Sequence, residues 1–313
     1  MNAHDSDQYA EPGLDALMRE RRQLINLGYR MLGSLGDAED VVQETYARWY
    51  AMPSEQRSAI DAPGAWLTKV ASRICLDLLG SARARRERYV GEWLPEPVPD
   101  GDDWLDGPSG AASVDPADRV TLDESINMAF LVVLDSMTPA ERVAFILHDV
   151  FRYPFADIGE IVGRTPAACR QLATSARRRI RAAHPSDTSP APRSEVVRRF
   201  KRAWESNDIN ALISLLDPDA VATADGGGLV SAAAEPIVGG DQIAAYFIGL
   251  LDLGIQFELA ERMVNGQPGL IVQVDKATSA VLAFDVADER VSRIWAVRNP
   301  EKLRPWTGDE RPD

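Results

Sequence analysis

The chain has 313 residues, of which 45% are hydrophobic and 26% charged, and its formal net charge at pH 7 is −14. This composition is typical of a folded soluble protein and excludes a chain that is disordered throughout. No apolar run approaches the roughly 18 residues of a membrane-spanning helix, and the stretch MNAHDSDQYAEPG lacks a signal-peptide pattern, so we expect no membrane contact. Because the two cysteines, Cys75 and Cys169, and the three histidines are scattered, we expect no metal, no cofactor and a cytoplasmic location.

Charge is distributed unevenly along the chain. Residues 91–138 carry 11 acidic side chains and 1 basic one, whereas residues 139–184 carry 8 basic and 4 acidic side chains. Within the basic part, residues 161–181 hold six arginines and no acidic residue. DNA is a dense polyanion and binds where basic side chains gather. The net charge alone therefore argues against DNA binding, but its distribution makes residues 161–181 the candidate DNA-binding segment.

The first predicted unit, residues 12–90, is all-helical. Apolar residues recur at helical spacing over residues 14–33 and predict one or two helices that end at Gly33 or Gly36. The stretch DAEDVVQETYARWYAM is predicted to form the next helix, with Asp37 as its cap. Acidic side chains at the start of a helix are ordinary capping residues, so this pattern alone indicates no function.

A long helix with a basic end is predicted to follow. Pro53 closes the preceding helix, residues 53–62 form a polar loop, and Pro63 opens the stretch PGAWLTKVASRICLDLLGSARARRERY. An aromatic side chain with interleaved basic ones suits strand separation and the capture of single-stranded DNA. Here these side chains are Trp66, Lys69, Arg73, Arg83, Arg85, Arg86 and Arg88.

Residues 91–118 have the composition of an acidic linker, because they are rich in proline, glycine, aspartate and serine. Trp93, Leu94, Trp104 and Leu105 interrupt this polar composition. An inert tether seldom contains two tryptophans, so we expect parts of the linker to dock on a surface of the protein. We also hypothesise that its acidic side chains cover the chain's own basic helices in the free protein.

Residues 119–184 return to helical patterns. Thr138-Pro139 and Thr165-Pro166 have the residue types of a cap followed by the first helical position. A short helix, a turn at Gly163-Arg164 and a longer helix make a helix-turn-helix pattern. The predicted helices span residues 119–136, 139–151, 155–162 and 165–183.

The last of these helices has two faces. Its apolar stripe consists of Cys169, Leu172, Ala173, Ala176 and Ile180, and its polar stripe consists of Arg170, Thr174, Arg177, Arg178 and Arg181. Arg170 and Gln171 have the chemistry to read guanine and adenine edges, and the later arginines suit phosphates. A solvated surface helix with a basic end is the alternative, but the preceding helix and turn favour DNA recognition.

The pattern changes after a second short linker, residues 185–193. Residues 194–206, 208–216 and 241–251 predict helices, and four alternating runs follow, QFELAERMV, GLIVQVD, SAVLAFDVA and RVSRIWAV. Asn265-Gly266 and ADER supply turns between them. Helices followed by an antiparallel meander are typical of the α+β class. Residues 194–313 are therefore predicted to form a curved sheet wrapped around a helix.

Three functions compete for residues 194–313. Acid–base catalysis favours a histidine or a tuned carboxylate, but this stretch has no histidine. Asp225 and Asp241 are the candidate acids, yet Asp225 precedes three glycines and is more simply a turn residue. Ligand sensing and a regulatory contact with the rest of the chain are the alternatives, and we favour the regulatory contact.

Several motifs together resemble one family. GDAEDVVQETYARWY resembles the polymerase-binding helix of sigma-70 factors, and PGAWLTKVASRICLDLLGSARAR resembles the −10 helix of extracytoplasmic-function (ECF) sigma factors. MTPAERVAFILHDVFRYPFADIGEIVGRTPAACRQLATSARRRIR is similar to their region 4, which reads the −35 element. RYVGEWLPEPV, DGGG, NPEKL and the C-terminal α+β part resemble the SigJ-type subgroup, in which an NTF2/SnoaL-like domain follows region 4. The resemblance covers nearly the whole chain.

The resemblance implies a surface for each partner. Core RNA polymerase would meet region 4 at its β flap, and its β′ clamp helices would be bound by Asp37, Glu39, Asp40, Gln43 and Glu44. Residues 53–63 would capture a flipped −10 base, beside DNA contacts from Trp66, Lys69, Arg73, Arg83 and Arg85. Because many ECF factors have Asn near Arg73, we expect Arg73 to contact a phosphate. The −35 element of promoter DNA would be read by Thr165, Arg170, Gln171, Thr174, Arg177 and Arg178.

The resemblance also implies that the C-terminal domain controls the sigma regions in cis, in place of a separate anti-sigma protein. An intramolecular contact with the sigma core would be made by Asp225, Gly226, Gly227, Gly228, Asn299, Pro300, Lys302 and Leu303. For the stretch NPEKLRPW, an ordinary polar C-terminus is the alternative.

The predicted fold class is multidomain, with two all-α sigma domains, of which the second contains the helix-turn-helix, and a C-terminal α+β NTF2/SnoaL-like cone. The expected boundaries are residues 12–90, 91–118, 119–184, 185–193 and 194–313. The expected function is an alternative sigma factor that directs promoter-specific transcription initiation and is not an enzyme. There are two alternative functions: a helix-turn-helix regulator with a ligand-sensing domain, and a fused enzyme. Residues 37–50 favour the sigma factor, because a repressor has no use for a polymerase-binding helix.

Overall fold

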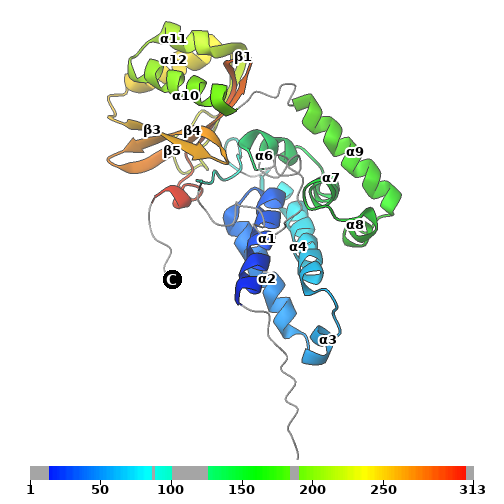
Figure 1. Ribbon diagram of the computed structural model, residues 1–313. Helices are drawn as coiled ribbons and strands as arrows, with labels where there is room; N and C mark the ends of the chain where they lie inside the picture. Colours follow the sequence, from blue (N-terminus) through cyan, green and yellow to red (C-terminus); the bar gives the residue numbers. More distant parts are fainter. Residues whose placement is uncertain (1–13, 87–88, 101–125, 184–189, 308–313) are drawn as a thin grey trace, which may run out of the picture.

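The structure is a computed structural model that describes residues 14–86, 89–100, 126–183 and 190–307. The first helical body lies at the start of the chain (Figure 1). It consists of α1 (Leu14–Leu32), α2 (Leu35–Ala51), the short α3 (Ser54–Ser58) and the long α4 (Pro63–Arg86). One continuous helix therefore covers the expected residues 14–33, and it ends at Gly33, whose φ of +72° breaks the helical path.

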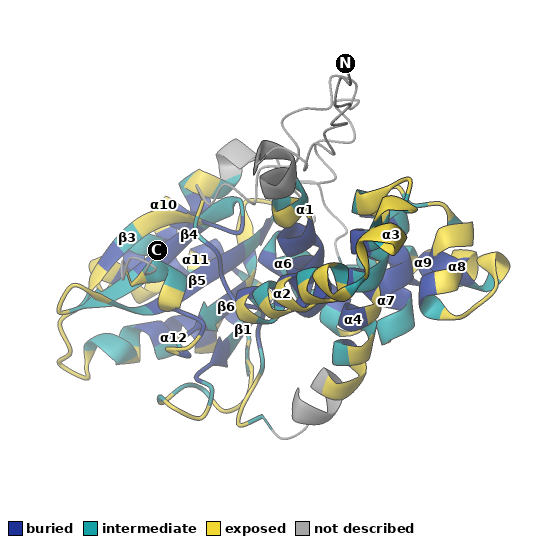
Figure 2. Ribbon diagram, turned by 90° about the horizontal axis from the view of Figure 1, so that it is seen from below, coloured by how far each residue is buried: buried dark blue, intermediate teal, exposed yellow. Residues whose placement is uncertain are grey.

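Two expectations near α2 are wrong. The cap is Ser34, whose hydroxyl accepts a hydrogen bond from the backbone N–H of Asp37 at 3.3 Å, so Asp37 lies in the first turn instead. Both residue types stabilise the start of a helix. Because the chain turns at Gly33, Ser34 takes the cap position. The expected loop at 53–62 contains α3, which has no buried residue and is coloured mostly as exposed (Figure 2).

The second helical body consists of α6 (Met128–Asp135), α7 (Pro139–Phe145), a π-helical turn (Ile146–Val150), α8 (Phe155–Val162) and α9 (Pro166–Ala183). The expected cap of α7 is confirmed, because Thr138 and Glu141 bond to each other's backbone N–H in a capping box. The helix expected at 119–136 is shorter at its start, because α6 begins at Met128 after the cap Asn127, whose side chain accepts from the N–H of Phe130. Residues 119–125 lie outside the described residues.

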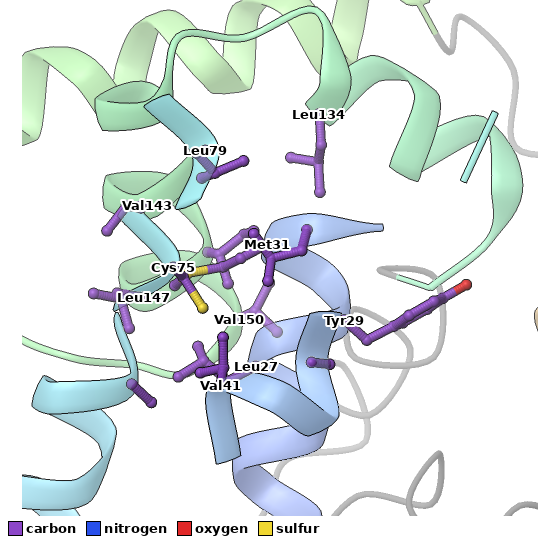
Figure 3. Close-up of a cluster of buried hydrophobic side chains, with 14 of the residues drawn as sticks. Leu27, Tyr29, Met31, Val41, Cys75, Leu79, Leu134, Val143, Leu147 and Val150 are labelled. Atoms are coloured by element: carbon purple, nitrogen blue, oxygen red, sulfur yellow. The ribbon is translucent and has the colours of Figure 1, made fainter. Parts of the chain in front are cut away.

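The two helical bodies share one hydrophobic core. Leu27, Met31, Val41, Cys75 and Leu79 of the first body meet Leu134, Val143, Leu147 and Val150 of the second (Figure 3). Buried Arg142 crosses this boundary, because its Nη1 donates a hydrogen bond to the carbonyl oxygen of Met31 at 2.8 Å. The bodies are thus packed together as one unit.

The C-terminal part is the expected α+β domain. Its helices are α10 (Pro190–Glu205), α11 (Ile209–Leu215) and α12 (Gly240–Leu251), and its strands are β1 (Leu216–Asp225), β2 (Ile237–Val238), β3 (Glu258–Val264), β4 (Gln267–Val274), β5 (Ala277–Ala287) and β6 (Arg290–Val297). The sheet order is β2-β1-β6-β5-β4-β3. Strands β3 to β6 form the expected antiparallel meander, whereas β1, parallel to β6, and β2 were not expected.

Both faces of this sheet are covered. Along β5, Leu282 and Phe284 pack with α10 and α12, while Val281 and Ala283 belong to a second core with Leu94 and with Met128 of α6. Figure 1 shows α10, α11 and α12 on one side of the sheet and α6 on the other. Successive side chains of a strand point to opposite faces of the sheet. One face of β5 therefore packs on the domain's own helices, and the other face packs on the helical bodies. Within the described ranges, no helix combines the length and apolar character that crossing a bilayer requires.

Candidate DNA and polymerase surfaces and an interdomain clasp

The helix-turn-helix consists of α8, Gly163 and α9. Gly163 has a φ of +69° and ends α8, and the backbone N–H of Arg164 donates to the carbonyl of Gly159 at 3.0 Å. A Cβ added at Gly159 would lie 2.6 Å from the carbonyl oxygen of Arg164, so the turn requires glycine there. Thr165 caps α9 as expected, because its hydroxyl accepts from the N–H of Ala168 at 3.2 Å.

The two stripes predicted for α9 are present. Cys169, Ala173 and Ala176 are buried, whereas Thr165, Arg170, Gln171, Thr174 and Arg178 are exposed. The guanidinium of Arg170 lies 5.3 Å from the ring centre of Phe155, which holds its stem on α8. The exposed side of α9 therefore presents cations and amide groups outward.

Arg177 is an exception to the predicted DNA-facing stripe. Its Nε and Nη2 donate to the two carboxylate oxygens of Asp149 at 2.7 and 3.1 Å. A bidentate pair of this kind holds both partners in a fixed geometry. In this structure Arg177 therefore ties α9 to the π-helical turn of the same helical body, and its charge is already paired.

The side chains predicted for the −10 element lie on α4, and two of them, Lys69 and Arg73, contact α8 of the second helical body. Trp66 packs against Trp49, with ring centres 5.2 Å apart, at the edge of the shared core. Lys69 forms an ion pair with the carboxylate of Glu160 on α8, and Arg73 Nη2 donates to the carbonyl oxygen of Glu160 at 2.9 Å. Glu160 was not expected at this site. The side chains of Arg83 and Arg85 lie outside the described residues.

The predicted polymerase-binding residues share the outward side of α2. Asp40, Gln43 and Glu44 are exposed, while Asp37 and Glu39 are half-buried near the start of the helix. Ala38, Val41, Val42 and Thr45 fill the opposite side. Glu44 also forms an exposed i,i+4 ion pair with Arg48 at 2.8 Å, which contributes little to stability.

A buried hub joins the C-terminal domain to the segment that follows α4. We call Asp225, Asn299 and Lys302 the clasp. Asp225 is fully buried at the end of β1, and its carboxylate accepts hydrogen bonds from the hydroxyl of Tyr89 at 2.6 Å and from the backbone N–H of Leu94 at 3.0 Å. The expectation that Asp225 is a turn residue is confirmed, because its carboxylate also accepts from the N–H of Gly227 at 3.0 Å.

The other two clasp residues complete this hub. Lys302 Nζ lies 2.7 Å from the Asp225 carboxylate, donates to the carbonyl of Leu94, and stacks 4.2 Å from the ring centre of Trp93. Asn299 Nδ2 donates to the Tyr89 hydroxyl at 2.8 Å. Burial and the hydrogen bond to Asp225 raise the pKa of Tyr89, so its hydroxyl stays protonated and can donate.

The glycines and the tail fit closely around the clasp. A Cβ added at Gly227 would lie 2.4 Å from Asn299 Nδ2, and one at Gly228 would lie 2.9 Å from Cβ of Val90. A Cβ added at Gly226 would lie 2.4 Å from the carbonyl oxygen of Val230. Leu303 is buried, whereas Pro300 is exposed. The predicted DGGG and NPEKL stretches thus meet at one place.

The first part of the expected linker is buried between the domains. Leu94, Glu96 and Val98 have at most 8% exposed surface, and Trp306 Nε1 donates to the carbonyl of Pro97 at 2.9 Å. The expected docking is confirmed for this part, whereas Trp104 and Leu105 lie outside the described residues. Asn265, at the β3–β4 turn, donates to the hydroxyl of Tyr29 on α1 at 2.6 Å.

Glu96 connects this buried segment to the start of α2. Its carboxylate accepts from the backbone N–H of Leu35 at 2.8 Å, and its own N–H donates to the carbonyl of Gly33 at 2.8 Å. Burial raises the pKa of Glu96 to about 7. The segment therefore holds an ionisable group against the predicted polymerase-binding helix.

Stability is expected to fall as the pH rises from 5 to 8, because of Glu96. Its pKa is about 7 in the folded protein and near the ordinary 4.5 in the unfolded chain, so the folded state keeps a proton that the unfolded state releases. The contribution is complete below about pH 4.5; at about 1.4 kcal/mol per unit, roughly 2–3 kcal/mol is lost through pH 7. Urea unfolding at several pH values checks this. Glu96→Gln should flatten the profile, and an unchanged slope would contradict the assignment.

The interior of the C-terminal domain is filled by aromatic rings. Phe200, Trp204 and Phe247 pack edge to face, with ring centres 4.7–6.4 Å apart, and Trp204 Nε1 donates to the carbonyl of Phe247 at 2.8 Å. Of the two candidate acids, Asp225 belongs to the clasp and Asp241 is exposed on α12. Among the described residues the structure therefore does not bring these acids together as an acid–base pair.

Comparison with known proteins identifies the two helical bodies. Family models for sigma-70 region 2 and sigma-70 region 4 match residues 17–85 and 127–180. The helix-turn-helix and the basic face of α9 lie within the second match. The helical bodies therefore define a transcription initiation factor of the sigma-70 type, a class that is not enzymatic.

Full-length relatives narrow this class. The chain is 37% identical over 297 residues to the ECF RNA polymerase sigma factor SigJ of Mycobacterium tuberculosis, with 90% of each chain covered. It is 34% identical over 307 residues to the probable ECF RNA polymerase sigma factor SigI of that species, with 97% of each covered. The SigJ crystal structure matches with a TM-score of 0.71 and 34% identity, covering 93% of this chain and 98% of that one.

The chain belongs to the ECF sigma factors of the sigma-70 family. It is an alternative sigma factor, which binds core RNA polymerase and promoter DNA and directs transcription initiation. The predicted fold class, two sigma domains followed by an NTF2/SnoaL-like α+β domain, is confirmed. The competing repressor and fused-enzyme interpretations are not supported.

Proposed function

We propose that α2 binds the β′ clamp helices of core RNA polymerase and that region 4 binds the β flap. The exposed carboxylates and amide on α2 (Asp40, Gln43 and Glu44) support this role, since their opposite side is buried in the core. Asp37 and Glu39 extend the same surface toward the start of the helix. The protein acts in the cytoplasm, with polymerase and promoter. Region 2 extends over residues 12–90, region 4 over 119–184 and the regulatory domain over 194–313, with linkers at 91–118 and 185–193.

The DNA surfaces lie on α9 and α4. Thr165, Arg170, Gln171 and Thr174 read the −35 element in the major groove, and Arg178 contacts a phosphate. Residues 53–63 and Trp66 receive the −10 element, whose backbone is held by Lys69, Arg73, Arg83 and Arg85. The exposed side of α9 supports the first assignment. Arg177 contributes by orienting α9 through Asp149.

Arg170→Ala is expected to weaken holoenzyme binding to its preferred −35 sequence by about 1–3 kcal/mol and to relax selectivity there. Arg178→Ala should weaken binding to all sequences more evenly and reduce its salt dependence, because it removes a phosphate contact. Competition binding with randomised −35 duplexes measures both. Equal loss of selectivity in the two variants would contradict the assigned roles.

The C-terminal domain restrains the sigma regions in cis. The observation that carries this proposal is the clasp, in which a fully buried carboxylate and a buried ammonium hold the segment from Tyr89 to Leu94. Asp225, Asn299 and Lys302 make the polar contacts. Gly226, Gly227 and Gly228 permit the close approach, with Pro300 and Leu303 shaping the tail.

Removal of residues 299–313 tests this restraint, because it deletes two of the three clasp residues. With core polymerase and a promoter selected by the holoenzyme, the shortened protein is expected to give more run-off transcript than the full chain. Equal output would contradict control in cis.

A further inference from the structure

A contact between region 2 and region 4 covers one of the two proposed DNA-binding surfaces, the −10 surface on α4. Glu160 of α8 lies over α4, where its carboxylate pairs with Lys69 and its carbonyl oxygen accepts from Arg73. The hydrogen bond and charge of Lys69 lower the pKa of Glu160, so the carboxylate is ionised at neutral pH. An acidic residue of region 4 thus sits on the two cations of region 2 that are assigned to the −10 strand.

The chemistry of this contact is that of a phosphate. A phosphodiester offers Lys and Arg a charged oxygen acceptor, and Glu160 offers a carboxylate and a carbonyl oxygen to the same two side chains. On the neighbouring helix, Arg170 and Gln171 stay exposed. The −10 surface is therefore occupied while the −35 surface is open.

The ion pair itself does not hold the regions together. The side chains of Lys69 and Glu160 are 36% and 64% exposed, and exposed pairs add little stability. The shared core (Figure 3) and the bond from Arg142 to Met31 do that. The role of Glu160 in the closed state is therefore to occupy Lys69 and Arg73 in place of a DNA phosphate.

This contact must open before the −10 strand can bind. Lys69 and Arg73 cannot hold a phosphate while the carboxylate and the carbonyl oxygen of Glu160 occupy them. Because α4 and α8 are in contact in this structure, Glu160 stays on the two cations until the regions separate.

We propose that Glu160 is a phosphate-mimicking latch that keeps the −10 surface of the free sigma factor closed while the −35 surface remains accessible. The order of engagement follows, with duplex bound first and single strand after the regions separate. This inference rests on the DNA surfaces assigned above and adds a device independent of the clasp.

Fluorescence anisotropy with the free full-length protein tests the latch. The probes are a labelled 12-nucleotide single strand of mixed sequence and a 20-base-pair duplex of mixed sequence. At 50 mM salt, Glu160→Gln is expected to bind the single strand about fivefold more tightly, and the gain should shrink at 300 mM salt. Duplex affinity should change less than twofold.

Two further variants serve as controls for this binding experiment. Asp157→Asn removes an exposed carboxylate from the same helix and should leave single-strand affinity unchanged. Adding Arg73→Gln to Glu160→Gln should abolish the gain. The latch is overturned if Glu160→Gln gives no gain, if Asp157→Asn gives an equal one, or if the duplex gains as much. Run-off transcription by the clasp variants is a separate readout, so failure of the latch does not imply failure of control in cis.

Discussion

Asp225→Ala is expected to lower the free energy of unfolding by about 3–5 kcal/mol, the usual cost of removing one partner of a buried charge pair. The substitution leaves the Lys302 ammonium, which is 9% exposed, without its carboxylate. It also removes the acceptor for Tyr89 and Leu94. The segment that follows region 2 should then exchange its amide hydrogens faster.

Urea unfolding and hydrogen exchange over residues 89–98 measure these effects. Asp241→Ala is the matched control, because it removes an exposed carboxylate from the same domain and should change stability by less than about 0.5 kcal/mol. A double variant, Asp225→Leu with Lys302→Met, should lose less than the sum of the single losses. Equal effects of Asp225→Ala and Asp241→Ala would contradict the clasp.

Arg142→Ala is expected to destabilise the docking of region 4 on region 2 by about 3–5 kcal/mol, because it removes a buried guanidinium that donates to three acceptors. Arg142 donates to the carbonyls of Leu134 and Met31 and to the carboxylate of Asp135, each at 2.8 Å. Burial lowers the pKa of Arg142 to about 9, so it remains charged at neutral pH. Lysine lacks the planar fork that reaches three acceptors, so Arg142→Lys should recover only part of the loss.

Separation of regions 2 and 4 is the readout for Arg142. A fluorophore pair on α2 and α9 should report a longer mean distance between the two helices in Arg142→Ala. The unfolding transition should also become broader, because the two regions no longer share one core. Arg178→Ala, which removes an exposed arginine from region 4, should change neither. An unchanged distance in Arg142→Ala would contradict the role of this residue.

Local signals in the sequence predicted the elements well. The cap at Thr138, the cap at Thr165 and the apolar stripe of α9 depend on neighbouring residues, and all are confirmed. The Asn265-Gly266 turn has two positive φ angles, as a tight hairpin requires. Strand β1 was missed because its stretch LDPDAVATAD contains residues that disfavour strands, and its pairing with β6 compensates for them.

The sequence patterns did not predict contacts between residues that are far apart in the chain. Glu96 lies in a proline-rich stretch that has the composition of an exposed linker, yet it is buried and bonds to Gly33 and Leu35 before and at the start of α2. Glu160 and Lys69 are separated by 91 positions, and no spacing rule relates them. The resemblance to a family did point to the DGGG and NPEKL stretches, but the partners of Asp225 emerged only from the fold.

Run-off transcription by holoenzymes assembled from core polymerase and full-length variants tests control in cis most directly. Asp225→Asn and Lys302→Gln each weaken the clasp and are expected to raise transcript yield several-fold over the unsubstituted protein. Asp241→Asn, which removes an acidic charge from the same domain, should leave the yield unchanged. Yields that are equal across all four proteins, or lower in both clasp variants, would contradict the proposal that the C-terminal domain restrains this sigma factor through the clasp.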